Sequence, residues 1–207
     1  MEPWTDKRRY TVGYQGGPGC HSERAGLTLL SERFIGWPFA SFADAAAALA
    51  NGHVDLILLP VFNSTTGPIL EALHASRPFS ALDETQLHIE HYLLAMPGAR
   101  RRDIKAVWAH PQVAKQCAGW IKQNGLELKV VDDGARRAPA FLKSRRRDVG
   151  VLGPVGIGKA TGLYPLEGPV QDDPDNRTTF RLMARTAPAK KPGELSNRKQ
   201  NRVPATA

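Results

Sequence analysis

Segments with the patterns of strands and of helices alternate along most of this 207-residue chain. Residues 54–60, for example, form a continuous apolar run, which is the pattern of a strand buried on both faces. Residues 111–124 place apolar side chains at helical spacing, and Gly125 is expected to end that helix. Such alternation predicts mostly parallel sheets with helices on both faces. Ligands bind to sheets of this kind beyond the carboxyl ends of the strands.

The other predicted elements continue this alternation. We expect strands over residues 10–15, 87–93, 106–109, 128–131, 148–152 and 180–184. We expect helices over residues 22–34, 41–52, 68–75, 138–143 and 155–161. Ser22 and Ser41 are expected to cap the first two helices, because a serine hydroxyl can accept a hydrogen bond from a free N–H of the first turn. Gly52 is expected to end the second.

Composition excludes several classes of protein. The formal net charge is +8, and half of it lies in residues 186–207, which are Pro-rich and expected to be disordered, as residues 1–9 are expected to be flexible. Without aromatic interleaving or a known module, the basic residues do not predict nucleic-acid binding. No apolar run is long enough for a membrane span and none follows the first charges, so we expect a cytoplasmic protein. Cys20 and Cys117 lie far apart, and neither a disulfide nor a metal site is expected.

Four polar segments follow predicted strands or lead into one. They are residues 13–22, residues 63–67, residues 110–117 and residues 176–180. In the first, Gly16 and Gly17 leave backbone N–H groups at the start of a helix, where anions bind, although such a turn can also be structural. In the second, Asn63, Ser64 and Thr65 can cradle a carboxylate or simply cap a helix. The segments are expected to converge on one cleft.

The third and fourth segments leave similar alternatives open. Gln112 can present an amide to a substrate at the start of its helix, whereas Cys117 falls on the apolar face and is expected in the core. In the fourth segment, strand alternation puts Arg177 and Thr179, with Arg181 after them, on one face. Thr178 and Phe180 lie on the other face. One face can carry a carboxylate clamp and the other a hydroxyl donor, or the segment is an ordinary edge strand.

In their order and spacing, these motifs resemble the catalytic domain of the prephenate dehydratase family, over roughly residues 10–185. The resemblance implies a two-lobed α/β fold like that of type II periplasmic binding proteins, with the substrate between the lobes. It implies a first lobe over residues 10–85, a second over 86–171 and a return segment over 172–185. It also implies a homodimer. No regulatory domain follows residue 185, so feedback control by phenylalanine is not expected.

The resemblance also implies a reaction, the decarboxylative dehydration of prephenate to phenylpyruvate without a cofactor. The substrate would be a small anionic cyclic acid. Thr178 matches the hydroxyl donor of the family, while Asn63, Ser64, Thr65 and Gln112 would orient the substrate. Residues 16–19 would shape one wall of the cleft.

Several family positions differ in this chain. The family's Arg in the last motif is Thr179, its Glu before Asn-Ser is Phe62, its Ser before His-Pro-Gln is Ala109, and its Tyr before Ser is His21. The family's Ser-Thr-Ala turn reads Asp-Gly-Ala at residues 133–135. The missing guanidinium removes a charge-assisted carboxylate contact of about 1.5–3 kcal/mol. We hypothesise that Arg177 or Arg181 replaces it, and that Phe62 makes the cleft more apolar.

These departures support two alternatives. One is a divergent family member in secondary metabolism, of a tropone-type pathway or a non-aromatising prephenate decarboxylase, acting on a related cyclic acid. The other is a module that binds a small acid without chemistry, because the two-lobed fold does so in many proteins.

Overall fold

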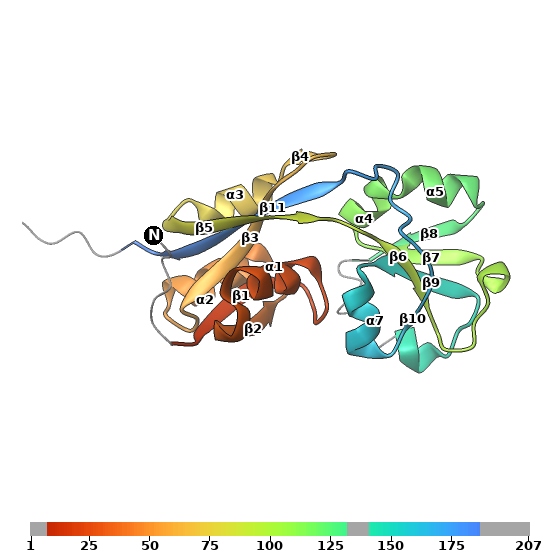
Figure 1. The fold of residues 1–207 in the computed structure, drawn as a ribbon, viewed down its shortest axis with the longest axis horizontal. Coiled ribbons are helices and arrows are strands. Elements are labelled where there is room, and N and C mark those ends of the chain that lie inside the picture. Colours follow the sequence, from red (N-terminus) through yellow and green to blue (C-terminus); the bar gives the residue numbers. More distant parts are fainter. Residues whose placement is uncertain (1–7, 132–140, 187–207) are drawn as a thin grey trace, which may run out of the picture.

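A computed structural model describes residues 8–131 and 141–186 of the chain. It consists of two lobes, each built on one β-sheet, and the chain crosses between them twice (Figure 1). The crossings lie between His88 and Tyr92 and between Glu167 and Arg177. This is the two-lobed α/β architecture, like that of periplasmic binding proteins, that the family resemblance implies. The first crossing comes slightly later than residue 86, because the strand that leads to it continues to His88.

The first lobe contains a sheet with the strand order β2-β1-β3-β11-β5, to which the short strand β4 adds beside β3. Its elements are β1 (Tyr10–Gln15), α1 (His21–Leu30), η1 (Ser31–Arg33), β2 (Phe34–Phe39), α2 (Phe42–Ala50), β3 (Leu56–Asn63), β4 (Gly67–Pro68), α3 (Leu70–Ser76), β5 (Phe79–His88) and β11 (Arg177–Arg185). Strand β1 pairs in parallel with β2 and β3. Strand β11 pairs antiparallel with β3 and β5.

The second lobe contains a sheet with the strand order β10-β6-β9-β7-β8. Its elements are β6 (Tyr92–Ala95), η2 (Arg101–Asp103), β7 (Ala106–Ala109), α4 (Pro111–Gln116), α5 (Ala118–Gln123), β8 (Glu127–Val130), β9 (Val149–Gly153), α7 (Val155–Thr161) and β10 (Tyr164–Glu167). Strand β7 is parallel to β8 and β9, whereas β6 is antiparallel to β9 and β10. Both sheets are therefore mixed, and the prediction of mostly parallel sheets was wrong. A strand that arrives from the other lobe enters its new sheet from the opposite end.

Each sheet is buried by helices on both faces, as the alternating pattern predicts. Along β3, Leu56 and Leu58 pack in the cluster that includes residues of α1, whereas Ile57 and Leu59 pack in the cluster that includes residues of α2. All four of these side chains are buried, which confirms the interpretation of the apolar run as a strand buried on both faces. Ser41 caps α2 as expected, since its hydroxyl accepts a hydrogen bond from the N–H of Asp44 at 3.1 Å.

Several predicted boundaries were wrong for local reasons. Helix α1 ends at Leu30, and its N-cap residue is Cys20, so Ser22 lies inside the helix and caps nothing. The segment that follows forms the edge strand β2, which was not predicted because it contains Gly36 and Pro38, two residues that are uncommon in strands. Residues 111–124 form two helices that meet at Cys117.

Other differences follow from the crossings and from the described range. The predicted strand over residues 87–93 is the junction of β5 and β6. Of the helix expected over residues 138–143, only 141–143 are described, and they are helical. The expectations for residues 1–7 and 187–207 lie outside the described residues.

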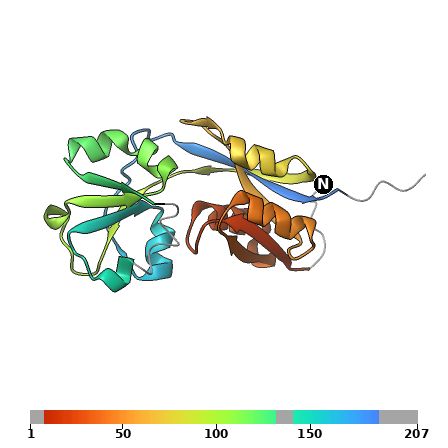
Figure 2. The same cartoon turned by 180° about the vertical axis from the view of Figure 1, so that it is seen from behind.

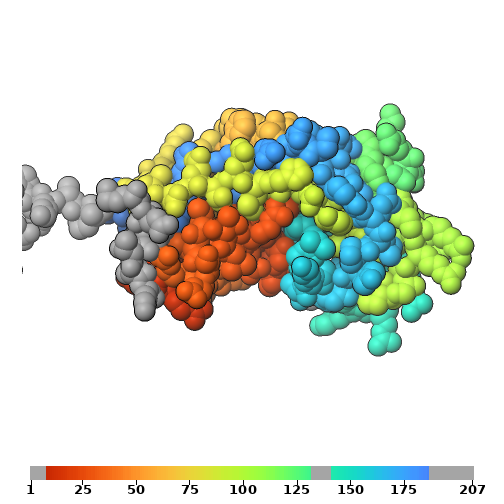
Figure 3. Space-filling model, in the orientation of Figure 1, coloured from red at the N-terminus to blue at the C-terminus, as the bar shows by residue number. Residues whose placement is uncertain are grey.

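The two lobes are joined by long strands and also touch directly. Figure 2 shows from behind that β5 and β11 extend from the first lobe toward the second. In the space-filling view, the start of α7 packs against the N-terminal segment of the first lobe (Figure 3). This contact needs two glycines, because a Cβ on Gly156 would lie 2.5 Å from the carbonyl oxygen of Gly19. Gly19 itself has a φ of +81°, which also favours glycine.

Candidate active site

A cavity of about 490 Å³ lies between the two lobes. Its wall combines the turn after β1, the start of α1, the ends of β3 and β9, the starts of α3, α4 and α7, the first crossing and the start of β11. Its volume is in the range of small-molecule sites. The four polar segments of the sequence all contribute to this wall, through Gly16, Asn63, Gln112 and Thr178 among others.

Asn63 organises the polar part of the wall. This residue ends β3, is buried, and donates from Nδ2 to Asn176 Oδ1 at 2.7 Å, to the carbonyl oxygen of Arg177 at 3.0 Å and to Thr178 Oγ1 at 2.8 Å. Its Oδ1 accepts hydrogen bonds from the backbone N–H groups of Thr65 and Thr66 at 3.0 and 3.1 Å. Because a backbone N–H can only donate, these two bonds fix which end of the Asn63 amide faces Thr178.

The orientation of Asn63 determines the role of the Thr178 hydroxyl. Thr178 lies directly opposite Asn63 in the β3–β11 pairing, so the fold itself brings the two side chains together. Since Thr178 Oγ1 accepts from Asn63, the hydroxyl proton of Thr178 is available for another acceptor. Thr178 is buried and lines the cavity, and so does Phe180 two residues later.

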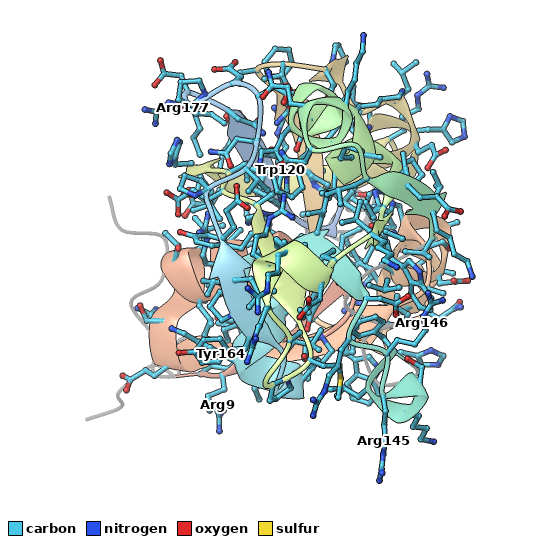
Figure 4. The ribbon with its side chains drawn as sticks, turned by 90° about the vertical axis from the view of Figure 1, so that its right-hand side faces the viewer. Arg9, Trp120, Arg145, Arg146, Tyr164 and Arg177 are labelled. Atoms are coloured by element: carbon cyan, nitrogen blue, oxygen red, sulfur yellow. The ribbon has the colours of Figure 1, made fainter. Side chains whose placement is uncertain are left out.

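The opposite face of β11 points away from the cavity. Arg177 is exposed and lies at the outer edge of the molecule (Figure 4). Arg181 forms an ion pair with Glu84 at 2.8 Å. Neither arginine lines the cavity, nor does Thr179, so this face of β11 lies away from the cavity wall where the hypothesised carboxylate clamp would act. Strand alternation assigned the two faces correctly but did not show which one meets the other lobe.

Other candidate residues lie beside the cavity rather than in its wall. Ser64 accepts a hydrogen bond from the N–H of Arg177 at 2.9 Å, and the Thr65 hydroxyl donates to Asn63 Oδ1 at 2.7 Å. Phe62 is 45% exposed and lies outside the lining, so it does not make the cavity more apolar. Gly17 is also outside the lining. Ser64 and Thr65 therefore support Asn63 and its partner strand.

The glycine-rich turn uses several of its N–H groups internally. Gly16 N donates to the carbonyl oxygen of Phe39 at 3.1 Å, and Gly19 N donates to Glu23 Oε2 at 2.6 Å. Cys20 N donates to the carbonyl oxygen of Gly17 at 3.2 Å. The turn therefore shapes the wall at Gly16, but these three N–H groups have partners within the protein.

Two histidines in the cavity wall, His21 and His91, lie next to each other and could carry a positive charge if protonated. The rings of His21 and His91 are 5.4 Å apart in an edge-to-face arrangement. His91 Nε2 is hydrogen-bonded to Gln116 Oε1 at 2.7 Å. Burial lowers the pKa of His91 to about 4, against the effect of this hydrogen bond. Burial also lowers the pKa of His21 well below its usual value, with further lowering from His91 and Arg24. Both imidazoles are neutral at neutral pH.

The described residues that line the cavity include no Lys or Arg. Glu71, at the start of α3, is the acidic side chain among them, and it lies at the exposed rim. A bound carboxylate therefore meets hydroxyl, amide and imidazole groups rather than a guanidinium. Ala109 is buried in the core of the second lobe, and residues 133–135 lie outside the described residues.

Cys117 is a core residue, as its helical position predicts. It is fully buried, and burial together with the nearby Asp172 raises the pKa of its thiol to about 12. Such a thiol stays protonated and is not a nucleophile. Within residues 8–131 and 141–186, no cluster of His, Cys, Asp or Glu side chains is arranged to hold a metal ion. The same part of the chain contains no helix long and apolar enough to cross a membrane.

Several residues that line the cavity were not among the predicted site residues, chiefly His91, Gln116, Ser22, Thr66 and Glu71. His91 carried a usable signal, because it is a polar residue at an inward position of an alternating apolar segment. Gln116 lies one turn after Gln112 on the same helix, and so reaches the same cavity. The exposed rim residues carried no such signal.

Comparisons with known proteins agree with this architecture. A family model described as "Prephenate dehydratase" matches residues 12–188. Arogenate dehydratase/prephenate dehydratase 1 of Arabidopsis thaliana is 32% identical over 87% of this chain and 46% of its own length. A bifunctional N-acyl-homoserine lactone acylase/prephenate dehydratase of Komagataeibacter europaeus is 31% identical over 89% of this chain and 67% of its own length.

Solved structures share the fold. The prephenate dehydratase of Arthrobacter aurescens, solved with L-Phe, superimposes with a TM-score of 0.74 at 23% identity, over 91% of this chain and 63% of that chain. This chain spans about half the length of the first curated relatives that it matches. The match of the family model nevertheless covers most of the sequence. The chain therefore belongs to the prephenate dehydratase family.

Proposed function

We propose that this chain is a prephenate dehydratase-like lyase that converts prephenate to phenylpyruvate, carbon dioxide and water. The observation that supports this most directly is the hydrogen bond from Asn63 Nδ2 to Thr178 Oγ1 in the cavity wall. It occupies an acceptor site on the Thr178 oxygen and leaves the hydroxyl proton for a ligand. The reaction class comes from membership of the family, which the match of the family model over residues 12–188 shows.

The reaction requires the protein to orient the substrate and to stabilise the departing hydroxyl group. The bond between the ring and its carboxylate breaks, its electron pair enters the ring, and hydroxide leaves from the opposite ring carbon and takes up a proton to become water. Aromatisation supplies the driving force, so the protein has to hold the substrate and stabilise the departing hydroxyl. In this proposal Thr178 donates a hydrogen bond to that hydroxyl. Asn63 positions Thr178, Gln112 contacts the substrate, and Phe180 packs against the ring.

Arogenate is a second candidate substrate, and the charge of the cavity favours it. Arogenate carries an ammonium group where prephenate carries a ketone, so it brings one positive charge of its own. The described lining residues include Glu71 but no Lys or Arg, so a ligand with this extra charge needs less neutralisation by the protein, whereas a dianion needs a cation that forms on binding. The Arabidopsis relative named above carries both substrates in its name.

The experiment incubates the purified protein with prephenate and separately with arogenate, and measures the aromatic product and carbon dioxide together. Thr178→Val, which removes the hydroxyl at nearly constant volume, and Thr178→Ser, which keeps it, serve as a matched pair. We expect both products from at least one substrate, retained by Thr178→Ser and reduced about a hundredfold or more by Thr178→Val. Carbon dioxide without an aromatic product would instead indicate a non-aromatising decarboxylase. Equal turnover by both variants would exclude the role of the hydroxyl.

A further inference from the structure

The polar atoms without partners gather at one place. Among the described residues, five buried side-chain nitrogen or oxygen atoms have no hydrogen-bond partner. Four of them belong to cavity-lining residues, namely both ring nitrogens of His21, Nδ1 of His91 and Oε1 of Gln112. Buried polar atoms are nearly always hydrogen-bonded, because an unsatisfied one costs about 1–3 kcal/mol. These atoms therefore indicate where a ligand makes its polar contacts.

The contacts of His91 fix the direction of its remaining nitrogen. Gln116 Oε1 accepts a hydrogen bond from His91 Nε2, so in the neutral ring Nε2 carries the proton. His91 Nδ1 then has a free lone pair and can only accept a hydrogen bond. The His21 ring is its neighbour, with its centroid 5.4 Å away. A small rotation of either ring at this separation allows a hydrogen bond between them.

Several charged and titratable groups lie near His21, but Arg24, the cation among those described, does not line the cavity. On α1 these are Glu23 and Arg24, on the first crossing Glu90 and His91, at the start of β6 Tyr92, and across the cavity Glu71 and His110. Glu23 is engaged by Gly19 N and by the Tyr14 hydroxyl. Arg24 donates to the carbonyl oxygen of His88 and does not line the cavity. Among the described lining residues a positive charge can therefore come from a histidine, and both ring nitrogens of His21 are without a partner.

We propose that His21 takes up one proton when a ring acid with two carboxylates binds, then donates one N–H to a ligand carboxylate and the other to Nδ1 of His91. This arrangement provides partners for the two ring nitrogens of His21 and for the remaining nitrogen of His91. It also supplies a cation in the bound state, where the described lining residues include no Lys or Arg. The proposal rests on the proposed function of the same cavity, and it identifies the substrate class as a dianionic ring acid. It makes His21, at the position where the family usually has Tyr, a specificity-determining residue.

Electrostatic linkage gives the proposal a measurable consequence. In the free protein the pKa of His21 is lowered by burial, His91 and Arg24, so the ring is neutral near pH 7. A bound dianion favours the protonated ring and raises this pKa. Between the free and bound pKa values, binding then takes up about one proton per site, and affinity falls about tenfold for each unit of rising pH. A ligand held by neutral donors alone shows neither effect.

The test is isothermal titration calorimetry near pH 7 in phosphate and in Tris, two buffers with very different ionisation enthalpies. The probes are prephenate and cyclohexane-1,4-dicarboxylate, a stable ring with two carboxylates. We expect about one proton taken up per bound dianion. His21→Tyr and His21→Gln keep a hydrogen-bonding group that does not take up a proton in this range, and we expect uptake near zero in both. His53→Gln, a change on the exposed loop after α2, is the matched control and should behave as the parent protein.

The outcomes separate this proposal from the proposed function. Turnover of prephenate with no proton uptake on binding of either probe would overturn the role of His21 and leave the function intact. Uptake with cyclohexane-1,4-dicarboxylate that His21→Gln removes, without any turnover of prephenate, would support His21 and reject the dehydratase. Unchanged uptake in both His21 variants would assign the proton to another group. Absence of binding by both probes would overturn the proposed substrate class.

Discussion

The substitution Asn63→Asp tests the central hydrogen-bond network with the smallest change of shape. Asn63 Nδ2 donates to three acceptors, the side-chain oxygens of Asn176 and Thr178 and the carbonyl oxygen of Arg177. A carboxylate oxygen in its place faces three other oxygens. The two hydrogens of Nδ2 serve these three acceptors, so at about 1 kcal/mol for each hydrogen the free energy of unfolding should fall by about 2 kcal/mol near pH 7. The bonds that Oδ1 accepts from Thr65 and Thr66 can remain.

The same substitution should also remove activity for a specific reason. With a carboxylate at position 63, the hydroxyl of Thr178 turns to donate to it, and its proton is no longer available to the cavity. Turnover of the substrate identified above should therefore fall about a hundredfold. Burial raises the pKa of the new carboxyl group in the folded protein above its unfolded value. The loss of stability should accordingly be small below pH 4, grow as the pH rises through the unfolded pKa of about 3.9, and be complete above the folded pKa.

Equilibrium urea unfolding, followed by tryptophan fluorescence at several pH values, measures the first effect, and steady-state turnover measures the second. Asn51→Asp makes the same chemical change at the exposed end of α2 and should alter stability by only about 0.5 kcal/mol. If Asn63→Asp unfolds at the same urea concentration as Asn51→Asp and retains full turnover, the network does not have the role described here.

Three further substitutions test other parts of the structure. In Gly156→Ala the new Cβ would lie 2.5 Å from a backbone oxygen of the first lobe, so the lobes must separate, and calorimetry should show weaker ligand binding with little change in unfolding. Arg181→Ala removes an exposed ion pair with Glu84, so it should cost less than about 1 kcal/mol in urea unfolding and leave substrate affinity unchanged. Burial raises the pKa of Asp55, but hydrogen bonds from Thr11 outweigh it and lower this pKa overall. Asp55→Asn should therefore destabilise the protein near pH 7, and urea unfolding should show this difference disappearing as the pH falls below about 3.9 and through the folded pKa.

Local patterns predicted the elements that are buried on both faces. The run from Leu56 to Pro60 is apolar at every position, so it identified β3. The sequence did not predict the edge strand β2, because an edge strand is largely exposed and needs no periodic apolar pattern. The sequence patterns also could not predict which strands are parallel and which are antiparallel. Strand direction depends on where the chain crosses between lobes, and alternating side chains carry no information about that.

The candidate site was predictable in its polar network but not in its charges. Asn63 and Thr178 are more than a hundred residues apart, yet each stands in a polar segment beside an apolar strand, and the sheet pairs them directly. The position of the hypothesised clamp could not be predicted, because alternation along β11 gives one face with Arg177 and another with Thr178 and does not distinguish between them. Which face meets the second lobe depends on the packing of both sheets, and no property of the strand by itself encodes it.

The location of the charges changes the physical problem that the cavity has to solve. A guanidinium clamp stays charged at any physiological pH and must be kept hydrated or paired when the cavity has no ligand. The neutral imidazole of His21 carries no such cost, because it becomes charged only when an anion arrives to stabilise the proton. The site gives up some affinity at high pH, and in exchange its described lining residues carry no permanent cation when the cavity is unliganded. Affinity that declines with pH in the parent protein, together with pH-independent affinity in His21→Tyr, is the pattern that this reasoning requires.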